Sequence, residues 1–154
     1  MRAILLGREL DLKFVTESGN PYKDDESRIQ IYQDEKQGIE VWTNAPLSFN
    51  DGSDESAKLV QIGPTAGTPT AGHKTGKPGM AKELRSQAVA IIEKVGIDQA
   101  RRSSLHPLED NRKGIMYFFR WDDFTKPIRE SELTPFIQVA LYADGSLAGY
   151  TNTL

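Results

Sequence analysis

Two stretches of this sequence decide the fold: Ile39-Glu40-Val41-Trp42-Thr43-Asn44 and Leu147-Ala148-Gly149-Tyr150-Thr151-Asn152. Each follows a similar segment, Ile29-Gln30-Ile31 in the first half and Ile137-Gln138-Val139 in the second. The two halves align without a gap, and apolar residues in them alternate with polar ones, a pattern typical of half-buried strands. We therefore interpret the chain as an internal repeat of one β-rich unit.

The match continues upstream, where Leu10-Asp11-Leu12-Lys13-Phe14 parallels Tyr117-Phe118-Phe119-Arg120-Trp121. Each unit then reads as a three-stranded antiparallel meander. The expected strands span residues 4–15, 28–33 and 39–44 in the first unit, and 115–121, 137–141 and 147–150 in the second. Asp144-Gly145 predicts a two-residue hairpin turn in the second unit.

One strong helix is predicted over residues 80–95, because apolar residues recur there at helical spacing. The residues on that face are Leu84, Ala88, Ile91, Ile92 and Val95. Gly96 stands where a left-handed residue would end the helix. Asp98 is placed to cap a further short turn that runs to Arg102.

The two units are separated by a segment rich in glycine and proline. Residues 57–62 predict a short strand, and residues 63–79 contain five glycines and three prolines. That composition favours an extended connection over a helix. We therefore divide the chain into a first meander (1–50), a linker (51–79) and a helix with a second meander (80–154), together forming one compact pseudo-symmetric domain.

These elements predict an α+β fold in which both meanders pack on the helix at 80–95. The strands would form one curved antiparallel sheet, or two facing sheets, because a meander with one apolar face needs a cover. Only the second unit brings a helix of its own. The first must take its cover from that helix or from another molecule, and the second alternative would make the protein an obligate oligomer.

The second half resembles a PepSY-type domain, in which a helix precedes strands that end in a characteristic hairpin. Residues 91–97 match the helix end, and residues 139–150 match the hairpin. The resemblance covers residues 80–152, with a degenerate version at 8–44. It implies a layout similar to cystatin-like folds, a secreted or periplasmic location, and a propeptide-like or inhibitory role beside peptidases. It implies no catalytic residue, and the chain lacks the Gln-x-Val-x-Gly loop that cystatins insert into cysteine proteases.

The length, charge and composition of the chain exclude several other classes of function. The chain has 154 residues, a formal net charge of -3 and no cysteine. Disulfides and thiolate chemistry are therefore excluded, and the whole-chain charge does not favour nucleic-acid binding. No apolar run is long enough to span a membrane. The apolar start at residues 1–6 is also too short for a signal peptide, so we interpret it as part of the first strand.

We expect no metal and no cofactor. Residues 72–77 superficially suggest a phosphate loop but have the wrong spacing, and the two histidines, His73 and His106, lack a ligand spacing for zinc. Three acidic groups offer hard oxygen ligands of the kind that calcium prefers: Asp24-Asp25, Asp122-Asp123 and residues 50–55. None has the spacing of a calcium loop. An enzymatic or ligand-binding alternative would use His106 beside Asp110, Asp122 or Asp123, with Arg120 in the lining.

The leading hypothesis is a non-enzymatic interaction or assembly module. Tyr117, Phe119 and Trp121 share the strand face that the core needs, which leaves Met116, Phe118 and Arg120 on the other face. We predict these three as an interaction surface for a protein partner, a peptidase or a second copy of the chain. Unpaired sheet edges are a further candidate.

Overall fold

A computed structural model describes residues 1–154 except 24, 50, 66–79, 109–110, 114 and 126–133. The elements, in chain order, are β1 (Arg2–Leu5), β2 (Arg8–Asp11), β3 (Lys13–Gly19), β4 (Arg28–Asp34), β5 (Ile39–Thr43), a 3-10 turn η1 (Ser56–Lys58), β6 (Leu59–Pro64), α1 (Met80–Lys94), α2 (Gln99–Ser103), β7 (His106–Pro107), β8 (Asn111–Lys113), β9 (Met116–Asp122), β10 (Phe136–Tyr142) and β11 (Leu147–Asn152). The predicted α+β class with one main helix is confirmed.

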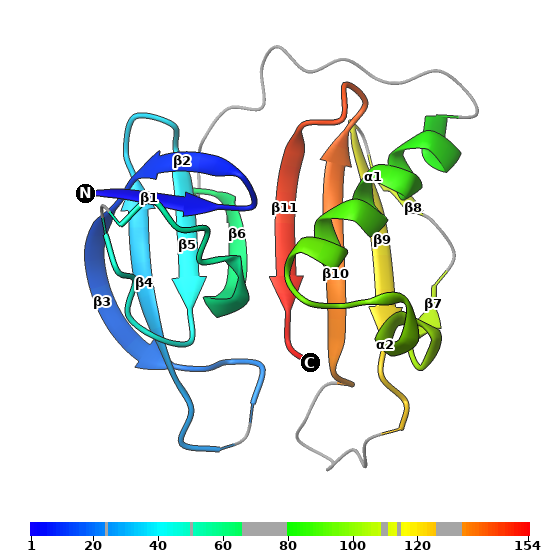
Figure 1. The fold of residues 1–154 in the computed structure, drawn as a ribbon, viewed down its shortest axis with the longest axis horizontal. Helices are drawn as coiled ribbons and strands as arrows, with labels where there is room; N and C mark the ends of the chain where they lie inside the picture. Colours follow the sequence, from blue (N-terminus) through cyan, green and yellow to red (C-terminus); the bar gives the residue numbers. More distant parts are fainter. Residues whose placement is uncertain (24, 50, 66–79, 109–110, 114, 126–133) are drawn as a thin grey trace.

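Nine strands form one antiparallel sheet in the order β3-β4-β5-β6-β11-β10-β9-β7, with β8 also paired to β9 (Figure 1). The central strand, β6, joins the two halves because it pairs with β5 on one side and β11 on the other. It extends the short strand expected at 57–62 to Pro64. Residues 66–79 of the expected linker lie outside the described residues, and the three-part division of the chain stays a prediction.

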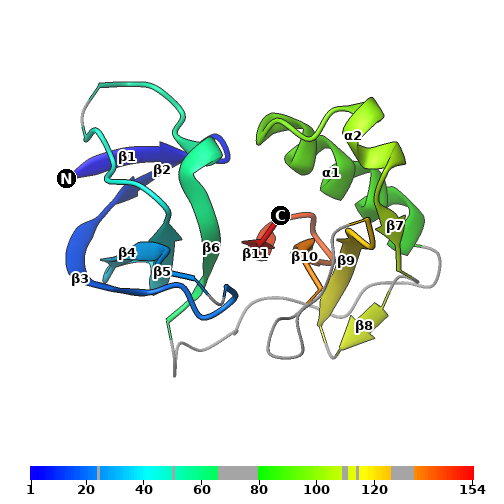
Figure 2. The ribbon, with the colours of Figure 1, turned by 90° about the horizontal axis from the view of Figure 1, so that it is seen from below.

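Both halves are covered on the same face of the sheet (Figure 2). Helix α1 lies on β9 and β10, and the separate β1–β2 hairpin lies over the first half. Leu5, Leu10 and Leu12 from this N-terminal segment join Val41 and Ile62 in the main core. The expectation that the first half takes its cover from α1 or from another molecule is therefore corrected: its own N-terminal hairpin supplies the cover.

That hairpin was expected as one strand over residues 4–15. Instead, the chain turns at Leu6-Gly7, where φ is 54° and 74°. Positive φ at both central residues is the geometry of a type I′ turn, which Leu6 adopts at a cost in strain. Two side chains hold the turn: Ser56 Oγ accepts a hydrogen bond from Leu6 N at 2.6 Å, and Asp54 Oδ2 accepts one from Gly7 N at 2.7 Å.

The end of α1 follows the prediction. Gly96 has φ of 97°, its amide donates to Glu93 O, and the amide of Ile97 donates to Ile92 O, each at 3.1 Å. This pair of bonds is a Schellman motif, which satisfies the last carbonyl groups of the helix. The predicted cap of the next turn is also confirmed, because Asp98 Oδ1 accepts from Arg101 N at 2.8 Å.

The hairpin between β10 and β11 differs from the prediction. Its turn is longer than two residues: Gly145 N donates to Tyr142 O, and Tyr142 N donates to Ser146 O, both at 2.9 Å. Gly145 alone in this turn has positive φ, at 86°. The geometry is that of a three-residue loop with a glycine bulge. Asp144 supports it by accepting from Ser146 N at 2.9 Å.

The two repeat hairpins have the same pairing register but turn opposite faces to the core. Val139 lies opposite Tyr150, and both are buried. The residues matched to them in sequence, Ile31 and Trp42, also lie opposite each other, but on the face away from the core. The sequence match therefore does not align equivalent packing positions, and duplication stays a sequence observation.

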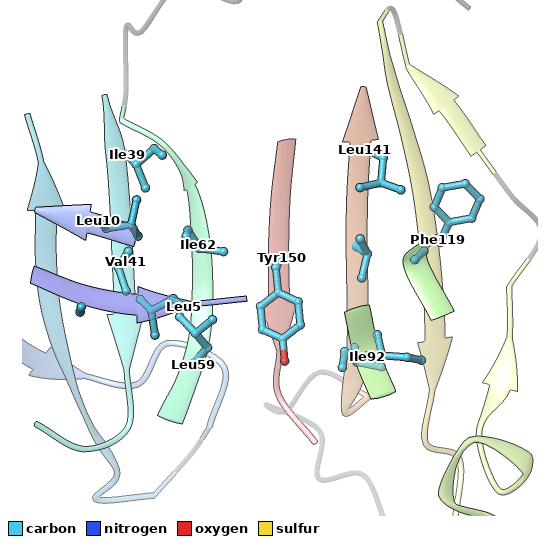
Figure 3. Close-up of a cluster of buried hydrophobic side chains, with 14 of the residues drawn as sticks. Leu5, Leu10, Ile39, Val41, Leu59, Ile62, Ile92, Phe119, Leu141 and Tyr150 are labelled. Atoms are coloured by element: carbon cyan, nitrogen blue, oxygen red, sulfur yellow. The ribbon is translucent and has the colours of Figure 1, made fainter. Parts of the chain in front are cut away.

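Tyr150 occupies the centre of the core, between the residues of the first half and those of the second (Figure 3). Its ring lies opposite Ile62 of β6, and it is 2% exposed. Within the described residues, its hydroxyl meets no partner at hydrogen-bond geometry. One apolar core thus runs through both halves. Burial raises the pKa of the Tyr150 hydroxyl at its midpoint, and the nearby side chain of Asn152 opposes this.

Candidate functional site on the outer face of the sheet

We call the sheet face opposite α1 and the β1–β2 hairpin the outer face. Strand β9 places the predicted surface residues Met116, Phe118 and Arg120 on it, because they alternate with core residues. Met116 and Phe118 are half-buried, however, and pack in a small second cluster. Its other members are Ile115, Ala140, Tyr142 and Ala148. The two residues thus support local packing, while Arg120 belongs to a different group.

Arg120 is positioned by two neighbours. Its Nε donates to Asp122 Oδ1 at 2.7 Å, and its guanidinium lies over the ring of Phe136, 3.9 Å from the ring centroid. The side chain of Arg120 is 33% exposed, while Asp122 and Phe136 are buried. A guanidinium held flat against an aromatic ring is ordered but keeps its outer edge for a partner.

Tyr22 lies between the two halves on the same face. Its ring centroid is 6.2 Å from that of Trp42 and 6.1 Å from that of Phe136, the latter in an edge-to-face arrangement. Its hydroxyl donates to Gln61 Oε1 of the central strand. Burial raises the pKa of Tyr22, opposed by a hydrogen bond with Thr151, so the phenol stays protonated at neutral pH.

Tyr22, Trp42, Arg120 and Phe136 together form what we call the aromatic patch. Trp42 Nε1 donates to Glu40 Oε1 at 2.7 Å, which fixes the indole beside Tyr22. Sequence reasoning could have found Trp42, since Val41 points to the core and its neighbour must point away. Tyr22 had no such signal, because it lies in the connection after β3 and reaches the patch only through the fold.

The patch follows a straight row across the sheet. Trp42 of β5 lies opposite Gln61, Gln61 opposite Thr151, Thr151 opposite Gln138, and Gln138 opposite Arg120 of β9. Trp42 and Arg120 are therefore equally distant from Thr151, two strands to either side, or about 10 Å each. The row carries an aromatic ring at one end and a cation at the other.

The sheet edges are less suited to binding a strand. Edge strand β3 has a bulge between Phe14 and Thr16, although Phe14 and Val15 are each 48% exposed. Phe14 lies opposite buried Tyr32, and the two rings meet edge to face with centroids 5.7 Å apart, but Phe14 stays half exposed because β3 is the edge strand. At the other edge, β7 has two residues and β8 three. Bulges and very short edge strands both oppose strand addition.

The predicted acid-base group is brought together only in part. His106 of β7 lies opposite Asp122 of β9 in the sheet, but among the described residues no hydrogen bond or ion pair joins their side chains. His106 is exposed, and its ring lies 5.3 Å from that of Phe124. Asp123 is fully buried and accepts from Arg101 Nη2 at 2.9 Å and Thr125 N at 3.0 Å. Asp122 is bound by Arg120, as above. Both carboxylates thus serve structural contacts, and Asp110 lies outside the described residues.

The acidic residues at 51–55 also serve the fold. Asp54 holds the hairpin turn, and Glu55 Oε1 accepts from Lys58 Nζ at 2.7 Å and Ser48 N at 2.8 Å. Asp51 accepts from Ser53 N at 2.9 Å. In the part of the chain that the structure describes, no cluster of three metal-ligating side chains is present. Asp24, Asn50 and His73, with the loop at 72–77, lie outside it.

Comparison with known proteins yields one solved structure. The chain resembles the Bacillus megaterium YpeB C-terminal domain with a TM-score of 0.51 and 15% sequence identity, over 93% of this chain. The fold is loosely PepSY-like. This chain covers 54% of that structure, about half its length.

At the level of sequence, no family model matches the chain. The curated proteins likewise contain no match. None of the helices in the described residues has the length and apolar character needed to cross a bilayer.

Proposed function

We propose that the protein is a non-enzymatic interaction module of PepSY-like type, and that its aromatic patch binds a second copy of the chain. The observation that carries this proposal is the patch itself. Trp, Tyr and Arg are the residues that dominate binding energy in protein interfaces. Here Tyr22, Trp42 and Arg120 are half-exposed and already held in place by their neighbours, which lowers the entropic cost of binding.

The row across the outer face is self-complementary. A two-fold axis parallel to β11 and passing above Thr151 would bring two outer faces together, as two sheets pack in a sandwich. Because Trp42 and Arg120 are equidistant from Thr151, each Arg120 would then meet Trp42 of the second copy. The carboxylate of Glu40, bound to that indole, adds a favourable charge for the arriving guanidinium.

Other assignments rest on the resemblance alone. A secreted or periplasmic location and a peptidase as an additional partner are the finer expectations from PepSY-type domains. The non-enzymatic assignment is supported by the structural use of Asp122 and Asp123, which removes the carboxylates that an acid-base site at His106 would need.

Sedimentation equilibrium over a range of concentrations tests the proposal. We expect the wild type to form a dimer. Trp42→Ala and Arg120→Gln should each raise the dissociation constant of that dimer at least tenfold. Arg8→Gln is the matched control, since Arg8 lies on the β1–β2 hairpin and contacts Gln37. Circular dichroism would verify that each variant is folded. A wild type that stays monomeric at about 1 mM, or a dimer indifferent to both substitutions, would refute it.

A further inference from the structure

The β1–β2 hairpin covers the first half of the sheet without belonging to it. It forms a two-stranded sheet of its own, and in the described chain an isolated bridge between Ile4 and Asp54 is its only strand-type contact with other segments. Leu5 and Leu10 attach it to the core by apolar packing. Its polar attachment depends mainly on side chains outside the hairpin, which accept hydrogen bonds from its backbone.

Asp54 anchors the turn of the hairpin. Its Oδ2 accepts from Gly7 N at 2.7 Å. Its Oδ1 accepts from the amide and the hydroxyl of Ser56, and the oxygen of that hydroxyl accepts from Leu6 N at 2.6 Å. Lys94 Nζ lies beside Gly7 but forms no ion pair with Asp54 among the described residues. Both amides of the turn therefore depend on one carboxylate, Gly7 directly and Leu6 through Ser56.

Asp34, which is 1% exposed, anchors strand β2 of the hairpin. Its Oδ2 accepts from Asp11 N at 3.0 Å and from Gln37 Nε2 at 2.9 Å. The side-chain oxygen of the same Gln37 accepts from Arg8 Nε at 3.1 Å. The backbone amide of Lys36 also binds Asp34. Asp34 thus holds Asp11 directly and positions the acceptor of Arg8, so both ends of β2 depend on this second carboxylate.

Hydrogen bonds hold both carboxylates in the ionised form. Burial raises the pKa of Asp34, but hydrogen bonds from Gln37 and Asp11 keep it below its ordinary value. Burial also raises the pKa of Asp54, and hydrogen bonds, the Ser56 hydroxyl first, outweigh this increase. Because both pKa values are lowered in the folded state, the stabilisation that these groups provide is present above the ordinary pKa of aspartate, about 4, and is lost as the pH falls.

The neighbouring acidic side chains have partners of their own. Glu55, next to Asp54, is bound by Lys58 Nζ at 2.7 Å. The carboxylate of Asp11 is bound by the amino group of Met1 at 2.7 Å, and this pair lies within the hairpin. Neither pair joins the hairpin to the sheet, so the acid sensitivity of its attachment falls on the two anchoring carboxylates.

We propose that the β1–β2 hairpin is an acid-released cover: protonation of Asp34 and Asp54 detaches it as a unit, while the nine-stranded sheet and α1 stay folded. Its departure uncovers an apolar face of the sheet to which Tyr32, Val41 and Ile62 contribute. Local opening requires less free energy than global unfolding, and it often separates supersecondary units such as a hairpin. The aromatic patch lies on the opposite face of the sheet, so this inference does not depend on self-association.

Hydrogen exchange of the full chain, followed by two-dimensional 15N NMR at pH 7, tests the proposal. An asparagine in place of each anchor imitates the protonated carboxyl group, so acid is not needed. We expect Asp34→Asn combined with Asp54→Asn to raise the opening constant of the β1–β2 amides at least about tenfold, the effect of weakening hydrogen bonds to two charged acceptors. The amides of β10 and β11 should keep their wild-type protection.

Asp25→Asn combined with Asp51→Asn is the matched control. Both carboxylates accept within their own turns, from Ser27 N at 2.8 Å and from Ser53 N at 2.9 Å. This control should leave the exchange of the hairpin amides unchanged. Circular dichroism verifies that the variants are folded. If the double variant does not fold, Asp54→Asn alone takes its place, with a smaller expected increase.

Acid should produce the same opening in the wild type. After correction for the intrinsic effect of pH on exchange, the opening constant of the hairpin should rise at least about tenfold between pH 7 and pH 3, before β10 and β11 lose protection. The double variant should lack this increase. Hairpin amides that exchange only together with those of β10 and β11, or a double variant with wild-type protection of the hairpin, would overturn the proposal.

Discussion

Tyr150 of β11 lies directly opposite Ile62 of β6, and this contact joins the cores of the two halves. The hydroxyl of Tyr150 is buried there and meets no hydrogen-bond partner among the described residues. A buried polar group without a partner costs free energy, about 1–3 kcal/mol. The ring itself lies between the core residues of the two halves, so the ring and its hydroxyl have opposite effects on stability.

Tyr150→Phe should therefore keep or raise the free energy of unfolding, by up to about 1 kcal/mol, while Tyr150→Ala should lower it by about 3–5 kcal/mol through the cavity it leaves. Denaturant unfolding monitored by circular dichroism measures both. If Tyr150→Phe were destabilised by more than about 1 kcal/mol, the hydroxyl would have a partner in solution, and Asn152, two residues along the same strand, would be the first to examine.

Asp54 stabilises the turn of the β1–β2 hairpin, which covers the first half of the sheet. Its carboxylate accepts from Ser56 Oγ, from Gly7 N at 2.7 Å and from Ser56 N at 2.9 Å. Burial raises the pKa of Asp54, but these hydrogen bonds, the Ser56 hydroxyl first, keep it below its ordinary value. Asp54→Ala should lower the free energy of unfolding by about 2 kcal/mol, because two backbone donors lose a charged acceptor.

Asp51→Ala is the control for Asp54→Ala. Among the described residues, the Asp51 carboxylate accepts from Ser53 N at 2.9 Å and Ser53 Oγ at 2.7 Å, both within its own turn, and Asp51 is exposed. Asp51→Ala should lower the free energy of unfolding by less than about 0.5 kcal/mol. Equal effects of the two substitutions in urea unfolding would show that the hairpin does not depend on Asp54.

The N-terminal hairpin also marks where prediction from the sequence ended. Leu10 and Leu12 are buried as their alternation indicated, but the turn before them is Leu6-Gly7 and lacks the Asn-Gly or Asp-Gly signature of a hairpin. Asp54 and Ser56, distant in sequence, supply the bonds that make the turn possible. A tertiary contact thus replaced a local signal, and no local pattern could reveal the cover.

Local chemistry was more informative in the second half. Gly96 and Asp98 end one helix and begin the next as predicted, because caps depend on a few adjacent residues. The faces of the repeat hairpins could not be predicted in this way. A strand with apolar residues on both faces, such as β4 with Ile31 and Tyr32, can turn either one to the core, and the choice is made by the neighbouring layers.

In the candidate site, too, the sequence predicts local features but not contacts between distant segments. Alternation along β9 correctly placed Met116, Phe118 and Arg120 on the outer face, where Met116 and Phe118 also pack with residues of β10 and β11. Their role as an interaction surface stays a prediction. The contact of Tyr22 with both Trp42 and Phe136 joins three segments that are remote in sequence. Such a convergence follows from the strand order, which periodicity does not specify.

Gly145 has two reasons to be glycine. Its φ is 86°, and a Cβ atom there would collide with the side-chain amide of Gln87 on α1. Gly145→Ala should lower the free energy of unfolding by about 1–2 kcal/mol, part of it from backbone strain. Gly52→Ala is the matched control, because Gly52 has φ of 77° but no atom within 4 Å of the added methyl. The difference between the two thermal shifts measures the Gln87 contact, and identical shifts would mean that Gln87 moves aside freely.

Asp123 makes the free energy of unfolding depend on pH in the acidic range. Hydrogen bonds from Thr125 and Arg101 lower the pKa of Asp123 from 3.8 to about 2. Because the folded state holds the carboxylate ionised more strongly than the unfolded state, the stabilisation is complete above about pH 4 and is lost as the pH falls toward 2. Unfolding measured between pH 2 and pH 7 should therefore show a steeper loss for the wild type than for Asp123→Asn.

At pH 7, Asp123→Asn should itself lower the free energy of unfolding by about 2–3 kcal/mol, since the amide oxygen that replaces the carboxylate carries no negative charge to pair with Arg101. Arg101→Gln removes one of the two hydrogen-bond donors that lower the pKa of Asp123 but keeps Thr125. The loss of stability of this variant on acidification should therefore fall between those of the wild type and Asp123→Asn. A wild type and an Asp123→Asn variant with parallel pH profiles would mean that Asp123 has an ordinary pKa in the folded protein, and that the contact with Arg101 is weak in solution.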